Sequence, residues 1–282
     1  MVEGSARSFK VGDSVTDWAL GSSLLFCPAD RPDRYEKALA AADTVILDLE
    51  DAVAPARRPE ARVALVEHPV DPARVIVRVN PRSTADYDED IRCLARTGYR
   101  TIMLAKTEDV REVEEADRYQ VVALCETARG VLASAEVVRA RNLAGVMWGA
   151  EDLMASLGGS SSRLPDGRYR DVARHAKSTV LLHAAASGVP AIDTVFLDVA
   201  DVAGLAAEAD EAVASGFVAK ACIHPSQAAV VRRAFQPSAE NVTWARRVVA
   251  GSEDSAVFLL DGQMIDAPLV AQARQILRRA DA

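Results

Sequence analysis

Short apolar runs alternate with amphipathic segments along most of the chain. Each run is only a few residues long and is bounded by polar residues, proline or glycine, which is typical of strands buried on both faces. These runs predict strands at 24–28, 44–49, 75–79, 100–105, 121–125, 144–148, 190–193 and 218–223. The segments between them have helical spacing. They predict helices at 30–42, 57–66, 84–96, 108–118, 127–139, 169–187 and 200–215.

The regular alternation predicts the fold class. Eight strand–helix units in 282 residues favour an α/β fold, a (β/α)8 TIM barrel, because such barrels reach this length as a single domain. An open doubly wound sheet is the main competitor. It would have a glycine-rich phosphate turn after the first strand, where this chain has CPADRPDR. We expect a flexible leader at 1–20, the barrel at 21–235, and C-terminal helices with a lid at 236–282.

Polar side chains collect at the carboxyl ends of the predicted strands. These residues are Asp48, Glu50, Asp51, Arg78, Lys106, Glu126, Glu151, Asp152, Asp193 and His224. In a barrel these ends converge on one face, where catalytic residues lie. The plainer alternative for each acidic residue is that it caps the following helix. For His224, which precedes a proline, a structural or supporting role is preferred.

The chemistry of these residues indicates a metal site. Glu126 and Asp152 offer two carboxylates without nearby cysteine or histidine, the pattern for Mg²⁺. The alternative is that either pairs only with Arg78 or Arg129. Arg78 is predicted to hold a substrate carboxylate, since its planar fork matches one bidentately; the alternative is a salt bridge to Asp48 or Glu50.

A lysine at a strand end raises a different chemistry. A desolvated Lys106, or Lys220, could form a Schiff base with a carbonyl. A metal site and a Schiff base are alternative ways to stabilise a carbanion. The carboxylate pair favours the metal.

Composition limits which kinds of binding partner the chain can have. The chain has 33 basic and 41 acidic residues, a net charge of −8, which argues against nucleic acid. Its four cysteines show no CxxC spacing, which predicts reduced thiols in a cytoplasmic protein. No apolar run approaches the roughly 18 residues of a membrane span, and the N-terminus lacks the apolar core of a secretory signal.

Seven motifs resemble the citrate lyase beta-subunit-like branch of the HpcH/HpaI aldolase family. They are LLFCPADRPDR at 24–34, ILDLEDAV at 46–53, VRVN at 77–80, CETARG at 125–130, WGAEDL at 148–153, CIHPSQ at 222–227 and GQMIDAP at 262–268. They occur in family order over nearly the whole chain. The sequence departs from the common pattern at Ala29-Asp30, Asp33 and Ala52, which affects the carrier of the acyl group more than the metal.

The resemblance implies a Mg²⁺-dependent TIM-barrel lyase, commonly a homotrimer. It implies that Glu126 and Asp152 hold Mg²⁺, that Arg78 binds substrate, and that Asp266 is catalytic from a C-terminal lid. A carboxylate of the DLED segment, Glu50 or Asp51, is the other candidate for proton transfer. Coenzyme A contacts are expected at Phe26, Lys37, Arg57, Arg58 and Asp193.

The implied reaction is a reversible Claisen-type cleavage of a short 3-hydroxyacyl thioester. A malyl-, citramalyl- or related CoA ester would give acetyl-CoA or another acyl-CoA and an oxo acid. A metal-dependent thioesterase, an aldolase acting on substrates without a thioester, a citrate lyase beta subunit of a larger complex, and a non-catalytic assembly subunit remain alternatives. The strand-end carboxylates argue against the last, because a binding subunit does not need them.

Overall fold

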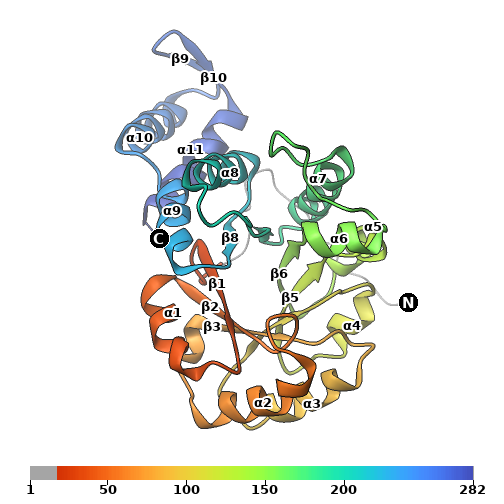
Figure 1. Ribbon diagram of the computed structural model, residues 1–282. Helices are drawn as coiled ribbons and strands as arrows, with labels where there is room; N and C mark the ends of the chain where they lie inside the picture. Colours follow the sequence, from red (N-terminus) through yellow and green to blue (C-terminus); the bar gives the residue numbers. More distant parts are fainter. Residues whose placement is uncertain (1–17, 282) are drawn as a thin grey trace, which may run out of the picture. The chain divides into compact units, whose positions relative to one another are not determined.

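A closed barrel of parallel strands forms the larger part of the computed structural model, which describes residues 18–281 (Figure 1). Within that range, eight strands pair in chain order and the last pairs with the first. They are β1 Ser23–Pro28, β2 Thr44–Asp48, β3 Val75–Val79, β4 Thr101–Leu104, β5 Gln120–Cys125, β6 Leu143–Trp148, β7 Ala191–Asp193 and β8 Ala219–Cys222. The predicted barrel is confirmed. The predicted leader, 1–20, lies almost entirely outside the described residues.

Helices follow the strands and lie around them (Figure 1). They are α1 Tyr35–Ala41, α2 Arg58–Glu67, α3 Ala85–Leu94, α4 Val110–Glu114, α5 Ala128–Val137, α6 Ala150–Ser156, α7 Asp171–Ala186, α8 Val202–Ser215 and α9 Pro225–Phe235. Short 3-10 turns at Pro32–Arg34, Pro55–Arg57 and Pro72–Arg74 lead into α1, α2 and β3. Two differences from the prediction stand out: α4 is shorter than expected, and α6 was not expected.

The barrel interior is filled by every second residue of the strands. Leu24, Ile46, Ile76, Met103, Val122, Leu124, Met147, Ile192, Ala219 and Ala221 form this cluster. Because side chains alternate along a strand, the next residues of the same parity also face inward, now at the carboxyl end. These are Phe26, Asp48, Arg78 and Glu126. The apolar interior therefore ends in a layer of charged side chains, which begins with Asp48, Arg78 and Glu126 and is called the polar layer below.

The described chain divides into two compact units, the barrel, described at 18–234, and a C-terminal unit, described at 235–281. The C-terminal unit packs α10 Ala239–Asp254 against α11 Ala267–Asp281 through Ala245, Val248, Ile265, Val270, Ala273 and Ile276. Between the helices, β9 Phe258–Leu260 and β10 Gln263–Ile265 form an antiparallel hairpin. Asp261 and Gly262 both have positive φ, as the tight turn of such a hairpin requires. Part of the segment predicted to contain a lid is thus a β-hairpin.

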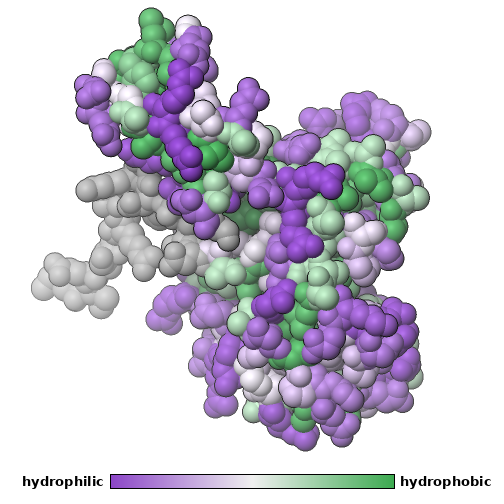
Figure 2. Space-filling model, turned by 90° about the vertical axis from the view of Figure 1, so that its left-hand side faces the viewer, coloured by the Kyte–Doolittle hydropathy of each residue, from purple (hydrophilic) through white to green (hydrophobic). Residues whose placement is uncertain are grey.

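The hairpin carries an exposed apolar pair. Leu259 and Met264 are cross-strand neighbours, and both side chains are mostly exposed. Figure 2 shows hydrophobic residues at the tip of this unit. Elsewhere, Cys27, Cys93, Cys125 and Cys222 are free and buried, and no helix among the described residues is long and apolar enough to cross a membrane.

Candidate active site

Arg78 and two carboxylates form the first part of the polar layer. Asp48 and Arg78 are register partners on β2 and β3. The guanidinium donates from Nε to Asp48 Oδ1 at 2.7 Å and from Nη2 to Asp48 Oδ2 at 2.6 Å, while Nη1 lies 3.0 Å from Glu50 Oε2. Asp48 is fully buried and also accepts the backbone N–H groups of Glu50 and Ala52. The same carboxylate therefore fixes both the arginine and the turn that carries Glu50.

The salt-bridge alternative for Arg78 is therefore present in the structure. Nε and Nη2 of the guanidinium both bind Asp48, and Nη1 contacts Glu50. Burial alone would lower the pKa of Arg78, but the charges of Asp48 and Glu50 raise it, so the side chain stays cationic. The ring of Phe26 lies under the guanidinium, 4.8 Å from Cζ to the ring centroid.

Lys106 joins the second part of the layer. Its Nζ lies 2.5 Å from Glu50 Oε1, 3.2 Å from Asp152 Oδ1, 3.5 Å from Asp51 Oδ2 and 4.0 Å from Glu126 Oε1. Burial alone would lower the pKa of Lys106, but the hydrogen bond that its ammonium donates to Glu50 and the charge of Glu126 raise it. An ammonium held in this way is a poor nucleophile, which disfavours the Schiff-base alternative.

Glu126 is almost entirely buried at the end of β5. Burial and the neighbouring charge of Asp152 raise its pKa, and the charges of Lys106 and Arg78 lower it; the balance is a pKa of about 8. Its Oε1 accepts the backbone N–H of Lys106 at 3.1 Å. The glutamate packs directly on Gly149, where an added Cβ would lie 2.6 Å from Glu126 Cβ and 2.8 Å from Oε2. Gly149 therefore leaves the space that Glu126 occupies.

Asp152 comes from a helix rather than from a strand end. Gly149 has an extended backbone and precedes α6, whose first turn contains Glu151 and Asp152. Only Asp152 faces Lys106; Glu151 accepts a hydrogen bond from Ser162 Oγ at 2.6 Å. The expectation that both residues end a strand is corrected accordingly.

The donor set fits a hard divalent cation. Within residues 18–281 no three Asp, Glu, His or Cys side chains are arranged as a complete metal-binding group. Glu126 and Asp152 nevertheless face one point, occupied by the Lys106 ammonium. Two carboxylates with room for water or substrate oxygens are typical of Mg²⁺, which seldom has an all-protein ligand set. These two residues would hold the ion.

The basic residues expected to contact coenzyme A differ in their exposure and in their ion pairs. Lys37 is exposed on α1. Arg57 is half exposed and pairs with Asp30 at 2.9 Å and Glu60 at 3.3 Å. Arg58 is mostly buried, pairs with Asp86 at 2.5 Å, and belongs to an ion-pair group between α2 and α3 that includes Arg62 and Asp90. Arg58 therefore takes part in the packing of α2 against α3 and is less accessible to a phosphate than Arg57.

Asp193 lies outside the polar layer. Ile192 faces the interior, so Asp193 points outward between β7 and the helices. It is fully buried and accepts hydrogen bonds from Trp148 Nε1 at 2.7 Å and Lys220 Nζ at 2.8 Å, with Lys177 Nζ at 3.5 Å. Lys220, also fully buried, pairs in addition with Glu208. Asp193 is thus committed to a buried ion cluster and cannot contact a ligand.

Asp266 and His224 both stand at helix starts. Asp266 belongs to the C-terminal unit, immediately before α11, and its Oδ1 lies 3.5 Å from the backbone N of Leu269. His224 is exposed before α9, and its Nδ1 lies 2.7 Å from Ser226 Oγ. Asp266 is thus placed to cap α11, through a long contact.

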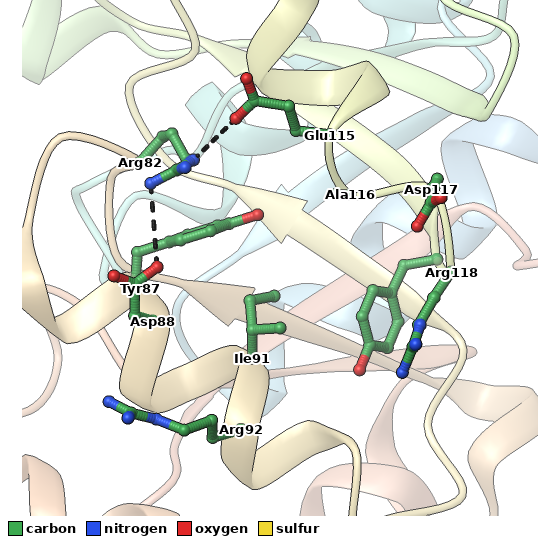
Figure 3. A pocket seen from close by; sticks show the side chains of 10 residues that line it. Arg82, Tyr87, Asp88, Ile91, Arg92, Glu115, Ala116, Asp117 and Arg118 are labelled. Atoms are coloured by element: carbon green, nitrogen blue, oxygen red, sulfur yellow. Dashed lines mark hydrogen bonds and ion pairs between the residues drawn. The ribbon is translucent and has the colours of Figure 1, made fainter.

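A shallow groove of about 460 Å³ lies on the outer side of the barrel rather than over the strand ends (Figure 3). It is lined by α3 and by the segment that joins α4 to β5. Its Arg82 pairs with Glu115 at 3.1 Å and Asp88 at 3.8 Å. None of the polar-layer residues lines it, and it contributes nothing to the site.

Comparison with known proteins identifies the family. Residues 22–225 match the model of HpcH/HpaI aldolase/citrate lyase, and residues 171–282 match that of a C–C bond lyase of the TIM-barrel fold. A citrate lyase subunit beta-like protein of Mycobacterium tuberculosis is 54% identical, with 93% of this chain and 96% of that protein covered. Human mitochondrial citramalyl-CoA lyase is 31% identical, with 92% and 85% covered.

A solved structure agrees with these matches. CitE from Mycobacterium tuberculosis, in complex with magnesium, acetoacetate and coenzyme A, superposes with a TM-score of 0.89 at 54% identity, covering 94% of this chain and 99% of that one. The family resemblance seen in the motifs is confirmed. The chain belongs to the HpcH/HpaI aldolase/citrate lyase family and, as the sequence predicts, is a carbon–carbon bond lyase.

Proposed function

We propose that the chain is a Mg²⁺-dependent lyase that reversibly cleaves a short 3-hydroxyacyl-CoA, such as malyl- or citramalyl-CoA, into an acyl-CoA and an oxo acid. One observation carries the proposal: a preorganised arginine and the carboxylate pair Glu126–Asp152 lie in the same polar layer. An oxo acid presents a carboxylate beside a carbonyl oxygen, so one end suits Arg78 and the other suits a metal. The relatives that act on or bind CoA compounds support this substrate class.

Each residue has a defined role in the proposed mechanism. Arg78, oriented by Asp48, holds the substrate carboxylate through its Nη1 edge. When bound at Glu126 and Asp152, Mg²⁺ supplies a Lewis acid for the substrate oxygen. Glu50 or Asp51 takes the proton of the 3-hydroxyl group, the bond between C2 and C3 breaks, and its electron pair passes to the thioester enolate. Asp266 is the proposed donor that protonates the enolate carbon to give the acyl thioester.

The coenzyme is proposed to lie near Phe26, Lys37 and Arg57. Lys37 is exposed, and Arg57 is half exposed, so it could exchange its contact with the exposed Glu60 for a phosphate. Arg58 and Asp193 are not included in this site, because Arg58 is mostly buried against Asp86 and Asp193 is fully buried against Lys220. We also propose that the chain assembles as a homotrimer in the cytoplasm, and its mass by light scattering tests the assembly.

A panel of 3-hydroxyacyl-CoA esters with Mg²⁺ tests the reaction. Release of acetyl-CoA or another acyl-CoA together with a free oxo acid supports the lyase. Release of free CoA with an intact hydroxy acid identifies a thioesterase instead. Turnover only when the thioester is carried by a protein, and only with added subunits, identifies a citrate lyase beta subunit.

A further inference from the structure

Lys106 lies in an unusual backbone position at the centre of the polar layer. Its φ of 52° is in the left-handed region, which residues other than glycine rarely adopt. The next residue fixes this turn: Thr107 is fully buried, its N–H donates to Leu124 O at 3.0 Å, and its hydroxyl donates to Leu104 O at 2.8 Å. The turn directs both the backbone N and the side chain of Lys106 toward Glu126 and its neighbours.

The ammonium contacts two kinds of carboxylate. Asp152 and Glu126 lie 3.2 and 4.0 Å away and are the proposed metal ligands. Glu50 and Asp51, at 2.5 and 3.5 Å, are not. Mg²⁺ binds carboxylate oxygens at about 2.0–2.1 Å, so an ion between Glu126 and Asp152 would occupy the place of the ammonium. Like charges so close together repel strongly inside a protein.

Lys106 has acceptors to which it can withdraw. Contacts to Glu50 and Asp51 would remain if the side chain left Asp152 and Glu126, so its charge would stay paired. The flexible stem of lysine permits such a movement without a change in the backbone. Beside Arg78, which contacts Glu50 in either case, Lys106 would then be the one cation among the four carboxylates without metal, and Lys106 and the metal ion would share them when metal is bound.

We infer that Lys106 is a built-in counter-cation of the metal site: its ammonium neutralises Glu126 and Asp152 until a divalent cation displaces it toward Glu50 and Asp51. Lys106 thereby sets the metal affinity as an internal competitor, and keeps the polar layer stable without metal. This positioning role rests on the magnesium site of the proposed function.

Calorimetric titration of the chelator-stripped full chain with MgCl2 tests the inference. Lys106→Met keeps the length of the side chain and removes the competing charge, so its Kd for Mg²⁺ should fall about tenfold or more below that of the wild type. Its melting temperature in EDTA should be lower than wild type and should rise more on adding Mg²⁺. Lys106→Arg retains the charge and should bind Mg²⁺ no more tightly than wild type.

Arg111→Gln is the matched control. It also removes one positive charge, from an exposed side chain that pairs only with Asp109 among the described residues, and should leave the Kd within about twofold. If the wild type binds Mg²⁺ but Lys106→Met binds it with an equal or higher Kd, the inference is overturned while the metal site stands. If neither binds Mg²⁺, the metal site itself is wrong.

A variant that is unstable without metal still gives a result. If Lys106→Met or Lys106→Gln is folded with saturating Mg²⁺ but unfolds on chelation, when wild type does not, the inference is supported. If both variants stay unfolded with saturating Mg²⁺, the inference is overturned, because the metal should replace the lost charge.

Discussion

Arg78 and Asp48 face each other across the β2–β3 pairing and share two hydrogen bonds of 2.7 and 2.6 Å. The pair is buried, so the arginine cannot rotate freely to meet a substrate. Its remaining edge, Nη1, points in one fixed direction and lies 3.0 Å from Glu50 Oε2, so a substrate carboxylate would take the place of that contact. An active-site arginine oriented in advance loses less freedom when the substrate carboxylate binds.

Replacing this arginine by lysine keeps the charge but removes the planar fork. A lysine cannot bind Asp48 bidentately and still offer a second edge to substrate. We expect Arg78→Lys to lower kcat/KM about tenfold or more, equivalent to about 1.4 kcal/mol. Steady-state kinetics with the CoA ester found in the panel measure this. Arg82→Lys, at a half-exposed surface pair, should have almost no effect, and a near wild-type value for Arg78→Lys would make Arg78 purely structural.

Removal of either proposed metal ligand should abolish metal-dependent turnover. Oxygen ligands predict that activity is lost on chelation and returns with Mg²⁺ or Mn²⁺. We expect Glu126→Ala and Asp152→Ala to be inactive at any Mg²⁺ concentration, with the circular dichroism spectrum of the folded barrel retained. The neighbouring Glu151→Ala is the control, since Glu151 bonds Ser162 instead. Full wild-type activity in excess EDTA would refute the metal site.

Gly149 is predicted to be as sensitive as the ligands themselves. In Gly149→Ala the new Cβ would lie 2.6 Å from Glu126 Cβ, so Glu126 must shift away from residue 149 and its position relative to Asp152 must change. We expect weaker Mg²⁺ binding and about a hundredfold loss of kcat/KM, as a displacement near 1 Å can cause. Gly98→Ala is the matched control, because its Cβ would meet Pro72 only at 3.9 Å. Unchanged metal affinity in Gly149→Ala would show that Glu126 is not a ligand.

Asp193 should determine stability rather than activity. Burial alone would raise its pKa, but Lys220 and Lys177 hold it below the ordinary value of 3.8. Its stabilising contribution is therefore present above that value and is lost as the pH falls through the lower pKa of the folded state. At pH 7, Asp193→Asn leaves the buried Lys220 underpaired and should cost about 3–5 kcal/mol.

Denaturant unfolding of Asp193→Asn and wild type measures this effect. The pH should run from about 3 to about 7, on both sides of the ordinary Asp pKa. The difference in unfolding free energy should shrink below the ordinary Asp pKa. Glu211→Gln removes the more exposed partner of Lys177 and should cost less than about 1 kcal/mol. An equal effect of the two substitutions would contradict the assigned role of Asp193.

The strands were predictable because each is a continuous apolar run between breaking residues. The same property hid the role of Asp193: a strand buried on both faces has no alternation, so the sequence does not reveal which side chains face inward. In a three-residue strand such as β7, which side chains face inward depends on how the strand pairs with β6 and β8. Glu126, by contrast, directly follows the longer apolar run 121–125. The sequence therefore predicts that it lies at a strand end with the other polar residues.

Helix α6 and the position of Lys106 differ in how far the sequence can predict them. The helix α6 has a local signal in the sequence: a glycine at the N-cap position, an acidic first turn, and the apolar Leu153 and Met154. The position of Lys106 had none, since its left-handed backbone and its four carboxylate neighbours depend on turns after three strands and on α6. Sequence reasoning placed the lysine at a strand end but could not show what it contacts.

Asp266 can be tested separately for capping and for chemistry. Asparagine caps a helix about as well as aspartate does but cannot transfer a proton as a carboxylate can. We therefore expect Asp266→Asn to keep the melting temperature of the wild type while losing most of kcat. Asp261→Asn, in the hairpin turn of the same unit, is the control and should retain activity. If Asp266→Asn keeps full activity, the catalytic role is wrong and capping accounts for the residue.

Mixed oligomers then show which chain supplies Asp266. Because Asp266 and Glu126 belong to different compact units, the proposed lid can act in its own chain or in a neighbour. We expect it to act in the neighbour, as the family resemblance implies. Co-expression of Asp266→Asn with Glu126→Ala, each inactive alone, should restore turnover, since some sites then combine an intact metal pair with an intact Asp266. Mixed oligomers that form, as shown by two affinity tags, yet remain inactive would place Asp266 in its own chain's site.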